Sequence, residues 1–390
     1  MTFDLAQARA DTPACARMIH FNNAGSSLSP RPVVEAVTDH LAREQEIGGY
    51  EAEAEAAPAL ESFYTGFASL LGADPSEIAY VENATRAWDM AFYGLPLTEG
   101  DRILTHGSEY ASNYLALLQQ ARRLGLHVDL VPSDGSGQID VAALERMVQP
   151  RTRLIALTHV PTQGGLVNPA EAVGRVARDR GLLYMLDACQ SVGQMPVDVG
   201  VIGCHVLSGT GRKFLRGPRG TGFLYVSREI IDHIEPPFID LHAATWTGAD
   251  SYELAEGAKR FENYESYVAG RVGLARAVAY AQAIGLDVIE ARVTALATAL
   301  RDYLADLPGV TVHDQGERRC GIVTFRIAGE SPADTASRLA KQSINVSVSV
   351  RRYAQLDLGA RELDALVRAS VHYFNTEDEV ERFANAVAAK

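Results

Sequence analysis

The stretch LLYMLDACQSVGQMPVDVGVIGCHVLSGTGRK, residues 182–213, contains two apolar segments that each lead into a reactive polar residue. Asp187 directly follows the first segment, and Lys213 follows the second within a glycine-rich loop. Lys213 is one of only four lysines in a chain that otherwise uses arginine as its cation. Lysine can lose its proton and form a Schiff base, whereas arginine stays protonated. The chemistry of the chain therefore depends on whether its fold brings Asp187 and Lys213 together.

The chain on both sides of this stretch alternates apolar strands with helices. Strands are predicted at 78–82, 102–106, 127–132, 153–160, 182–188 and 204–209, and helices at 83–92, 112–125 and 170–181. Strands that are apolar almost throughout and alternate with helices are typical of a parallel sheet covered on both faces. We therefore expect an α/β fold whose large domain has a mostly parallel sheet.

The pattern changes after about residue 280. A long helix at 288–306 precedes short strands and helices, among them a helix at 361–366 and a strand that begins at 367. This order predicts a smaller α+β domain with an antiparallel sheet. We predict an N-terminal segment at 1–20, a large domain at 21–275 and a small C-terminal domain at 276–390. The region 227–280 has no clear pattern.

Composition limits the kinds of partner that the chain can have. The 390 residues are 47% hydrophobic, so a large core is expected, and no run approaches the ~18 apolar residues of a membrane span. A net charge of −13 without a basic run argues against binding to nucleic acid or anionic lipid. The polar N-terminus MTFDLAQARADT does not resemble a targeting peptide. The four cysteines lack the spacing of a zinc site, so we expect reduced thiols, no metal centre and a cytoplasmic location.

Three polar clusters follow predicted strands, where doubly wound sheets bind their ligands. They are NATR (83–86) at a helix start, which suits a phosphate, then Asp187, and then Lys213. Read alone, each has an ordinary explanation: a helix cap, a structural hydrogen bond or a surface lysine. The glycines around Lys213 match neither the G-x-G-x-x-G nor the P-loop pattern. Together, the clusters suit a phosphorylated pyridine aldehyde held as a Schiff base.

The order and spacing of DACQS and the lysine loop resemble the class V aminotransferase family of fold type I enzymes, which use pyridoxal 5'-phosphate (PLP). This family includes cysteine desulfurases, other C–S lyases and isopenicillin N epimerase. The similarity extends from HFNNAGSSLSP (20–30) to VRASVHYFNTEDEVERF (367–383). It implies an enzyme that acts on a small amino acid as a homodimer, with the active site at the subunit boundary.

The resemblance implies a role for each matching residue. Lys213 is the implied catalytic residue, which carries PLP and moves the Cα proton, and Asp187 is the implied partner of the pyridine nitrogen. The other implied cofactor contacts are Ala84, Thr85, Thr210 and Arg212 at the phosphate, Gln190 and Thr162 at the phenolic oxygen, and Tyr110 at the ring face. Asn23, Ala24 and Gly25 are the implied lining of the substrate pocket, and Arg368 the implied ligand of the substrate α-carboxylate.

Two departures from the family pattern bear on the reaction. Tyr110 replaces the usual histidine, and tyrosine can stack on a ring but is a poor proton shuttle near neutral pH. The segment 347–367, where desulfurases carry a mobile cysteine, has none. We expect Cys189 to point away from the cofactor and Cys320 to be a packed thiol.

These departures favour β-elimination at a C–S bond, which gives pyruvate and ammonia as in a cystine lyase or hercynylcysteine sulfoxide lyase. Two alternatives remain open. One is a class V aminotransferase or epimerase, because the same residues support both reactions. The other is a non-catalytic PLP-binding partner protein. The stretches 242–246 and 260–267 suit contacts with a larger substrate or a dimer interface equally well.

Overall fold

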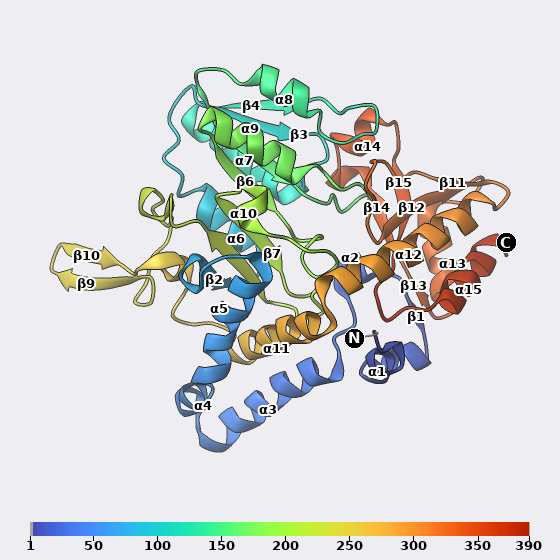
Figure 1. The fold of residues 1–390 in the computed structure, drawn as a ribbon, viewed down its shortest axis with the longest axis horizontal. Coiled ribbons are helices and arrows are strands. Elements are labelled where there is room, and N and C mark those ends of the chain that lie inside the picture. Colours follow the sequence, from blue (N-terminus) through green and yellow to red (C-terminus); the bar gives the residue numbers. More distant parts are fainter. Residues whose placement is uncertain (1–2, 390) are drawn as a thin grey trace.

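A seven-stranded sheet forms the centre of the computed structural model, which describes residues 3–389 (Figure 1). Its strands, in the order in which they lie side by side, are β2 (Ile78–Val81), β8 (Gly222–Val226), β7 (Val206–Thr210), β6 (Leu183–Asp187), β5 (Thr152–Thr158), β3 (Arg102–His106) and β4 (His127–Val131). Only β8 runs against the other strands of this sheet. The predicted mostly parallel sheet is therefore confirmed.

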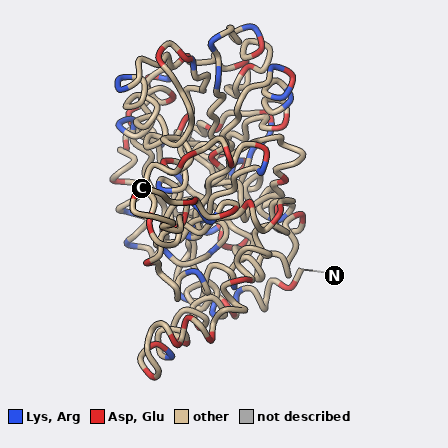
Figure 2. The backbone as a smooth tube through the Cα atoms, turned by 90° about the vertical axis from the view of Figure 1, so that its left-hand side faces the viewer, with Lys and Arg blue, Asp and Glu red and all other residues tan. Residues whose placement is uncertain are grey.

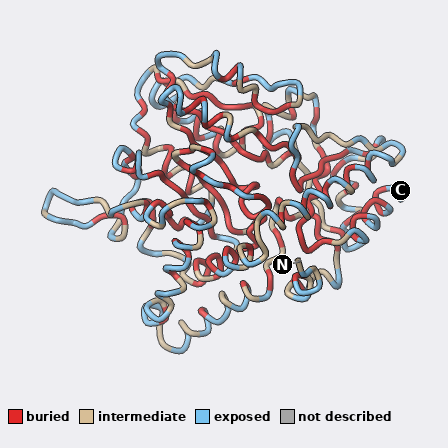
Figure 3. The backbone as a smooth tube through the Cα atoms, viewed as in Figure 1, coloured by how far each residue is buried: buried red, intermediate tan, exposed pale blue. Residues whose placement is uncertain are grey.

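Successive residues of each central strand enter two different apolar cores, one on each face of the sheet. In β6, Tyr184 and Leu186 pack into one core, and Met185 packs into the other. Side chains of the following helices complete the first core: α5 (Ala57–Leu71), α8 (Val141–Met147), α9 (Ala170–Arg180), α10 (Val199–Ile202) and α11 (Val268–Ile284). The second core lies under α6 (Ala84–Phe92) and α7 (Ala111–Leu124). Burial on both faces explains why the strands are apolar throughout (Figure 3).

A four-stranded antiparallel sheet organises the C-terminal part. Its order is β11 (Val310–Val312), β12 (Ile322–Ile327), β15 (Ala365–Ser370) and β14 (Ser347–Val350). The helices of this part are α12 (Leu286–Ala305), α13 (Pro332–Ala340), α14 (Asp357–Ala360) and α15 (Glu377–Ala388). The predicted helix at 361–366 is wrong: α14 ends before it, and Ala365 and Leu366 already pair with β14. Strand pairing and the full burial of Leu366 outweigh the local helical pattern.

The N-terminal segment packs with the C-terminal part. Its elements are α1 (Leu5–Ala10), β1 (Ile19–His20) and α2 (Asn23–Ser26), and β1 runs parallel to β13 (Ile344–Asn345). Ile19 and Phe21 share an apolar core with residues of β12 and α15. Along α11, Val278 still belongs to the core of the large sheet, whereas Ala281 belongs to this second core. The domain limits at 20 and 275 stay predictions.

The region without a clear sequence pattern contains a projecting hairpin. Its strands are β9 (Ala244–Gly248) and β10 (Ser251–Leu254), and the hairpin extends away from the body of the molecule (Figure 1). It is largely exposed along its length (Figure 3). Two further helices, α3 (Arg31–Ile47) and α4 (Gly49–Glu55), precede α5 in the sequence. The hairpin is thus an appendage and not part of either sheet.

Acidic and basic residues are interspersed around the molecule (Figure 2). No single helix within residues 3–389 is long and apolar enough to cross a membrane, and α11 and α12 meet that test only as a pair bent by 79°. In the same residues, no group of three His, Cys, Asp or Glu side chains is placed to hold a metal ion.

Candidate active site

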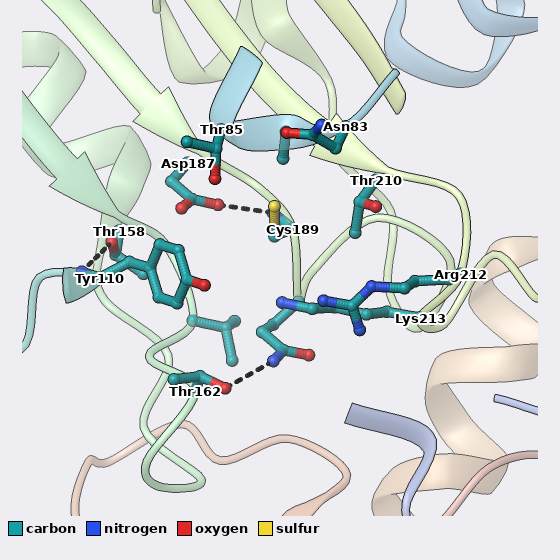
Figure 4. Close-up of a pocket in the computed structure, with 13 residues that line it drawn as sticks. Asn83, Thr85, Tyr110, Thr158, Thr162, Asp187, Cys189, Thr210, Arg212 and Lys213 are labelled. Atoms are coloured by element: carbon teal, nitrogen blue, oxygen red, sulfur yellow. Dashed lines mark hydrogen bonds between the residues drawn. The ribbon is translucent and has the colours of Figure 1, made fainter. Parts of the chain in front are cut away.

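A pocket lies at the carboxyl ends of β5, β6 and β7 (Figure 4). Its empty space, including the part open to solvent, is about 470 Å³. Its lining residues are Asn83, Ala84, Thr85, Tyr110, Thr158, Val160, Thr162, Asp187, Cys189, Gln190, Thr210, Arg212 and Lys213. All nine residues predicted to contact the cofactor are among them. The fold therefore brings Asp187 and Lys213 into one cavity, as the sequence required.

Lys213 supplies a buried amine. Its residue is only 7% exposed, and its Nζ makes no hydrogen bond within the described part of the chain. The Nζ atom lies 5.9 Å from the centre of the Tyr110 ring. Burial lowers the pKa of Lys213, and the nearby guanidinium groups of Arg212 and Arg368 act in the same direction. A lysine with a lowered pKa is suited to act as a nucleophile and as a base.

Asp187 is a buried carboxylate at the end of β6. Its Oδ2 accepts a hydrogen bond of 2.8 Å from Asn113 Nδ2, and its Oδ1 accepts one of 2.9 Å from the Cys189 backbone amide. These donors fix the orientation of the carboxylate. Because buried charges need partners, this arrangement suits a ligand that presents a cationic N–H group.

Glu109 extends this network behind the pocket. Its Oε1 accepts hydrogen bonds from Asn113 Nδ2 at 3.0 Å and from the Tyr110 backbone amide at 2.8 Å, and also from the Thr158 hydroxyl. Burial raises the pKa of Glu109 to about 7, with a further contribution from the charge of Asp187. Glu109 and Asn113 therefore hold the Tyr110 backbone and Asp187 in place.

The start of α6 lines one corner of the pocket, called the anion corner here because its groups are suited to bind an anion. The Asn83 side chain caps the helix by accepting a hydrogen bond of 2.9 Å from the Arg86 amide, and Ala84 and Thr85 begin the helix. A Cβ atom on Gly222 would lie 2.9 Å from the Asn83 carbonyl carbon, so only glycine lets β8 approach this corner. The free amides and the Thr85 hydroxyl are suited to bind phosphate.

Arg368 on β15 contributes a guanidinium group beside the pocket. Its Nη1 donates to the Thr162 carbonyl at 2.9 Å and to the Thr162 hydroxyl at 2.6 Å. Its Nε is buried without a hydrogen-bond partner. Burial lowers the pKa of Arg368 to about 10, and the charge of Arg212 contributes. An unsatisfied buried donor of this kind is costly, so a bound carboxylate would stabilise it.

The N-terminal segment lies behind the pocket and does not line it. Asn23 is fully buried, and its Nδ2 donates to the Ser370 carbonyl at 2.7 Å. The Ala24 carbonyl accepts a hydrogen bond of 3.1 Å from Gln190 Nε2, and the Gly25 carbonyl accepts one from Arg212 Nη1. Substrate contacts of these three residues stay predictions, as does the predicted phosphate contact of Arg212.

The expectation that Cys189 points away from the pocket is wrong, because Cys189 lines it (Figure 4). The chain leaves the extended conformation after Asp187, and the amides of Ser191 and Val192 both donate to the Ala188 carbonyl. Side chains therefore no longer alternate as they do in a strand. Burial raises the pKa of the Cys189 thiol well above its ordinary value, so the thiol is neutral.

Thr158 and Val160 also line the pocket and were not predicted. Thr158 is the last residue of β5, as Asp187 is the last residue of β6. The rule that ligands bind at strand ends could have identified it. As a whole, the pocket offers an amine, a carboxylate, an anion corner and a guanidinium group, which fits a phosphorylated pyridine aldehyde together with an amino acid.

Comparisons with known proteins agree with this geometry. The family model described as aminotransferase class-V matches residues 19–383. A probable cysteine desulfurase from Pyrococcus abyssi is 30% identical over 381 residues, which cover 96% of this chain and 94% of the relative. The structure of a cysteine desulfurase from Thermococcus onnurineus NA1 superimposes with a TM-score of 0.93 at 30% identity, covering 100% of this chain and 98% of that one. A cysteine desulfurase structure from Escherichia coli gives a TM-score of 0.91 at 25% identity, with coverage of 99% and 98%.

Proposed function

Because the chain belongs to the aminotransferase class-V family of fold type I, PLP-dependent enzymes, we propose that it cleaves the C–S bond of a sulfur-containing amino acid by β-elimination. The products are pyruvate and ammonia, together with the sulfur-containing leaving group. The proposed substrates resemble those of a cystine lyase or a hercynylcysteine sulfoxide lyase. This choice of reaction rests on the burial and protonation of the thiols near the site.

A desulfurase that stores sulfur on a protein thiol needs an accessible thiolate. The segment from β14 to β15 contains no cysteine. Cys189 is buried, and its raised pKa keeps the thiol neutral. Cys320 is also buried, and burial raises its pKa to about 11. These thiols are poor sulfur acceptors, which supports release of the leaving group without a protein-bound persulfide.

Each of these pocket residues has a separate role in the proposed reaction. PLP, when bound, supplies an electron sink for the electrons released at Cα. Lys213 Nζ would hold the cofactor covalently, and its amine would take the Cα proton of the substrate. The Asp187 carboxylate would pair with the protonated ring nitrogen, and the amides of Ala84 and Thr85 would hold the phosphate. Arg368 orients the substrate by pairing with its α-carboxylate.

Product analysis of the purified holoenzyme tests this proposal. L-Cystine, an S-substituted cysteine sulfoxide and L-cysteine are supplied in turn, and pyruvate, ammonia, alanine and 2-oxo acids are quantified. We expect equal amounts of pyruvate and ammonia from one of the first two substrates, and no alanine. Alanine from L-cysteine would indicate desulfuration, an intact 2-oxo acid would indicate transamination, and a D-amino acid would indicate epimerisation.

The lysine assignment has its own control. Lys213→Ala should lose the cofactor absorbance at ~400 nm and all product formation, because the covalent link is gone. Lys259→Ala removes another lysine at a distance from the pocket and should keep both. Absence of any product from holoenzyme that binds PLP normally would favour a non-catalytic PLP-binding protein.

We also propose that the protein is a homodimer. Large apolar side chains are exposed between 238 and 264, including Leu241 at 78% and Trp246 at 75%. Exposed apolar clusters of this kind are typical of interaction surfaces. Light scattering of the purified protein should give twice the monomer mass. The cytoplasmic location stays a prediction that cell fractionation would test.

A further inference from the structure

The end of β5 is shared between the active pocket and a second cavity. Thr158 and Val160 line the active pocket, whereas His159, which lies between them in the sequence, lines the second cavity. The empty space of this cavity, including the part open to solvent, is about 940 Å³. Its other walls include the start of α9 and the segment that precedes β12. No step of the proposed reaction uses this cavity.

His159 supplies a buried imidazole without a partner. The residue is only 5% exposed, and neither of its ring nitrogens makes a hydrogen bond within residues 3–389. Burial lowers the pKa of His159 to about 4, and the charge of Arg318 acts in the same direction. A neutral imidazole has one N–H donor and one acceptor. Because an unpaired buried polar group is costly, His159 points to a ligand in the cavity.

The start of α9 adds two free backbone donors. Pro169, the residue before the helix, cannot cap it with a side chain. The amides of Glu171 and Ala172 have no hydrogen-bond partner in the part of the chain that the structure describes, and both residues line the cavity. The N-terminal end of an 11-residue helix carries partial positive charge, so these amides favour an anion.

Two guanidinium groups also line the cavity. Arg175 lies on α9 and makes no hydrogen bond or ion pair with any described residue. Arg318 lies in the segment before β12, and its Nη2 pairs with Glu290 Oε1 at 2.6 Å. Both arginines are exposed to solvent, so an anion can reach them from the open side of the cavity.

Two acidic residues line the same cavity, but only one of them opposes an anion. Asp198 Oδ1 accepts a hydrogen bond of 2.9 Å from the Val201 amide, so this carboxylate caps α10. Its Oδ2 atom is close to Gly72, where a Cβ atom would lie 2.8 Å away from it. Glu171 is exposed, and solvent screens its charge. The unpaired donors therefore outweigh the one free carboxylate.

We propose that this second cavity binds the phosphate group of a small anion, at a site separate from the active pocket. The donors come from three directions: the end of β5, the start of α9 and the segment before β12. A tetrahedral phosphate group can accept from all three, whereas a planar carboxylate matches fewer of them. The anion contacts His159 and therefore the part of β5 that both cavities share. This inference does not depend on the proposed reaction.

Calorimetric titration of the holoenzyme at low salt tests the proposal, because the cofactor's own phosphate already fills the anion corner. Inorganic phosphate represents the free ion, glycerol 3-phosphate represents a phosphate ester, and acetate is the planar control. We expect saturable binding of phosphate or of its ester, and the tighter of the two identifies the source of the group. Acetate should bind at least fivefold more weakly. Absence of saturable phosphate binding, or equal binding of acetate, would overturn the proposal.

Variants of α9 assign the binding to the second cavity. Arg175→Gln should weaken phosphate binding at least about fivefold, since a charged donor is lost at a solvent-exposed site. Arg178→Gln is the matched control, because Arg178 is exposed on the same helix but does not line the cavity. Glu171→Gln should tighten binding about two- to fivefold by removing the opposing charge. If Arg175→Gln and Arg178→Gln both bound phosphate as the wild type does, the site would lie elsewhere.

Arg368→Gln separates this site from the active pocket. It removes the guanidinium group beside the active pocket and should leave phosphate affinity unchanged, because Arg368 does not line the second cavity. Loss of phosphate binding in Arg368→Gln would place the anion in the active pocket and overturn the proposal. The calorimetric readout does not require turnover, so failure of the proposed elimination would leave this test intact.

Discussion

At the scale of single residues, Glu109 gives the site a titrating group that never touches the pocket. Its carboxyl group is fully enclosed and joins the Tyr110 backbone to Asp187 through Asn113. Burial raises its pKa from 4.5 to about 7. A carboxyl group whose pKa is raised by folding favours the folded state below its ordinary pKa, and this contribution is lost as the pH rises through the raised value.

We therefore expect Glu109→Gln and the wild type, both without bound cofactor, to differ in how their unfolding free energies change with pH. Each pH unit between 4.5 and about 7 corresponds to about 1.4 kcal/mol, so the wild type should lose about 3 kcal/mol of unfolding free energy relative to the variant over that range. Urea unfolding at pH 4.5 and pH 8 measures the difference. The exposed Glu61→Gln control should show no such change. A difference that does not vary with pH would contradict the raised pKa of Glu109.

Cys189 leads to a second prediction at this scale. Its thiol lines the pocket but is neutral, so we expect Cys189→Ala to retain product formation within about threefold, because the thiol takes no part in the chemistry. Mass spectrometry after turnover should find no persulfide on the wild-type protein. If Cys189→Ala lost activity while Cys15→Ala kept it, the result would contradict our proposal and support a desulfurase reaction.

The sequence predicted individual pocket residues well where they end a strand or begin a helix. Asp187 ends β6 and Thr85 lies in the first turn of α6, whereas Lys213 lies in the loop after β7 and was identified by its residue type. The prediction failed at Cys189 because it assumed that side chains alternate as in a strand, whereas the chain forms a turn after Asp187. The contact of Asn22 with Arg368 joins positions 346 residues apart, and no local pattern reports such a contact.

At the scale of elements, the lysine loop depends on a close contact with the loop that follows β6. Gly193 has φ +97°, and a Cβ atom there would lie 2.4 Å from the Leu215 amide nitrogen. Gly220, in the lysine loop itself, has φ +76° but open space around it. Gly193 is thus required by both backbone conformation and space, whereas Gly220 is required by conformation alone.

We therefore expect Gly193→Ala to lower the unfolding free energy by at least about 3 kcal/mol and to weaken PLP retention, because the backbone near Lys213 must move. Gly220→Ala should cost only about 1 kcal/mol and keep the cofactor. Chemical unfolding and absorbance of the two variants provide the comparison. Equal effects of the two substitutions would show that the contact at Gly193 does not position the lysine loop.

Several elements of the large sheet, such as β5 and β6, were predictable because the strand is mostly apolar and is followed by a helix. The prediction failed at 361–366, where a helical pattern borders β15 and the cross-strand pairing decides the outcome. The reversed direction of β8 and the pairing of β1 with β13 depend on contacts between distant segments. Periodicity carries no information about such contacts.

At the scale of the whole molecule, Arg216 joins three parts of the chain. Its guanidinium group donates to Thr12 Oγ1 at 2.6 Å, to the Leu28 carbonyl at 2.7 Å and to the Tyr373 hydroxyl at 2.6 Å. It also lies 4.4 Å from the centre of the Phe374 ring. One side chain of the lysine loop thus connects the N-terminal segment and the C-terminal part.

Arg216→Gln should lower the unfolding free energy by about 3 kcal/mol or more, since several buried partners lose a charged donor at once. Arg216→Lys should not restore stability, because an ammonium group cannot reach the same partners in one plane. Urea unfolding of both variants, with the exposed Arg219→Gln as control, measures the effect. A loss below about 1 kcal/mol in Arg216→Gln would mean that the three parts are held together elsewhere.

The pairing of β1 with β13, and the hydrogen bond from Asn23 to Ser370, have a consequence for biosynthesis. Arg368, the proposed ligand of the substrate carboxylate, contacts Asn22, a residue that is translated 346 positions earlier. A ribosome that has translated only the strands of the large sheet has made Lys213 and the start of α6, but not Arg368. We therefore expect a nascent chain to contain the proposed cofactor ligands before it contains the proposed ligand of the amino acid.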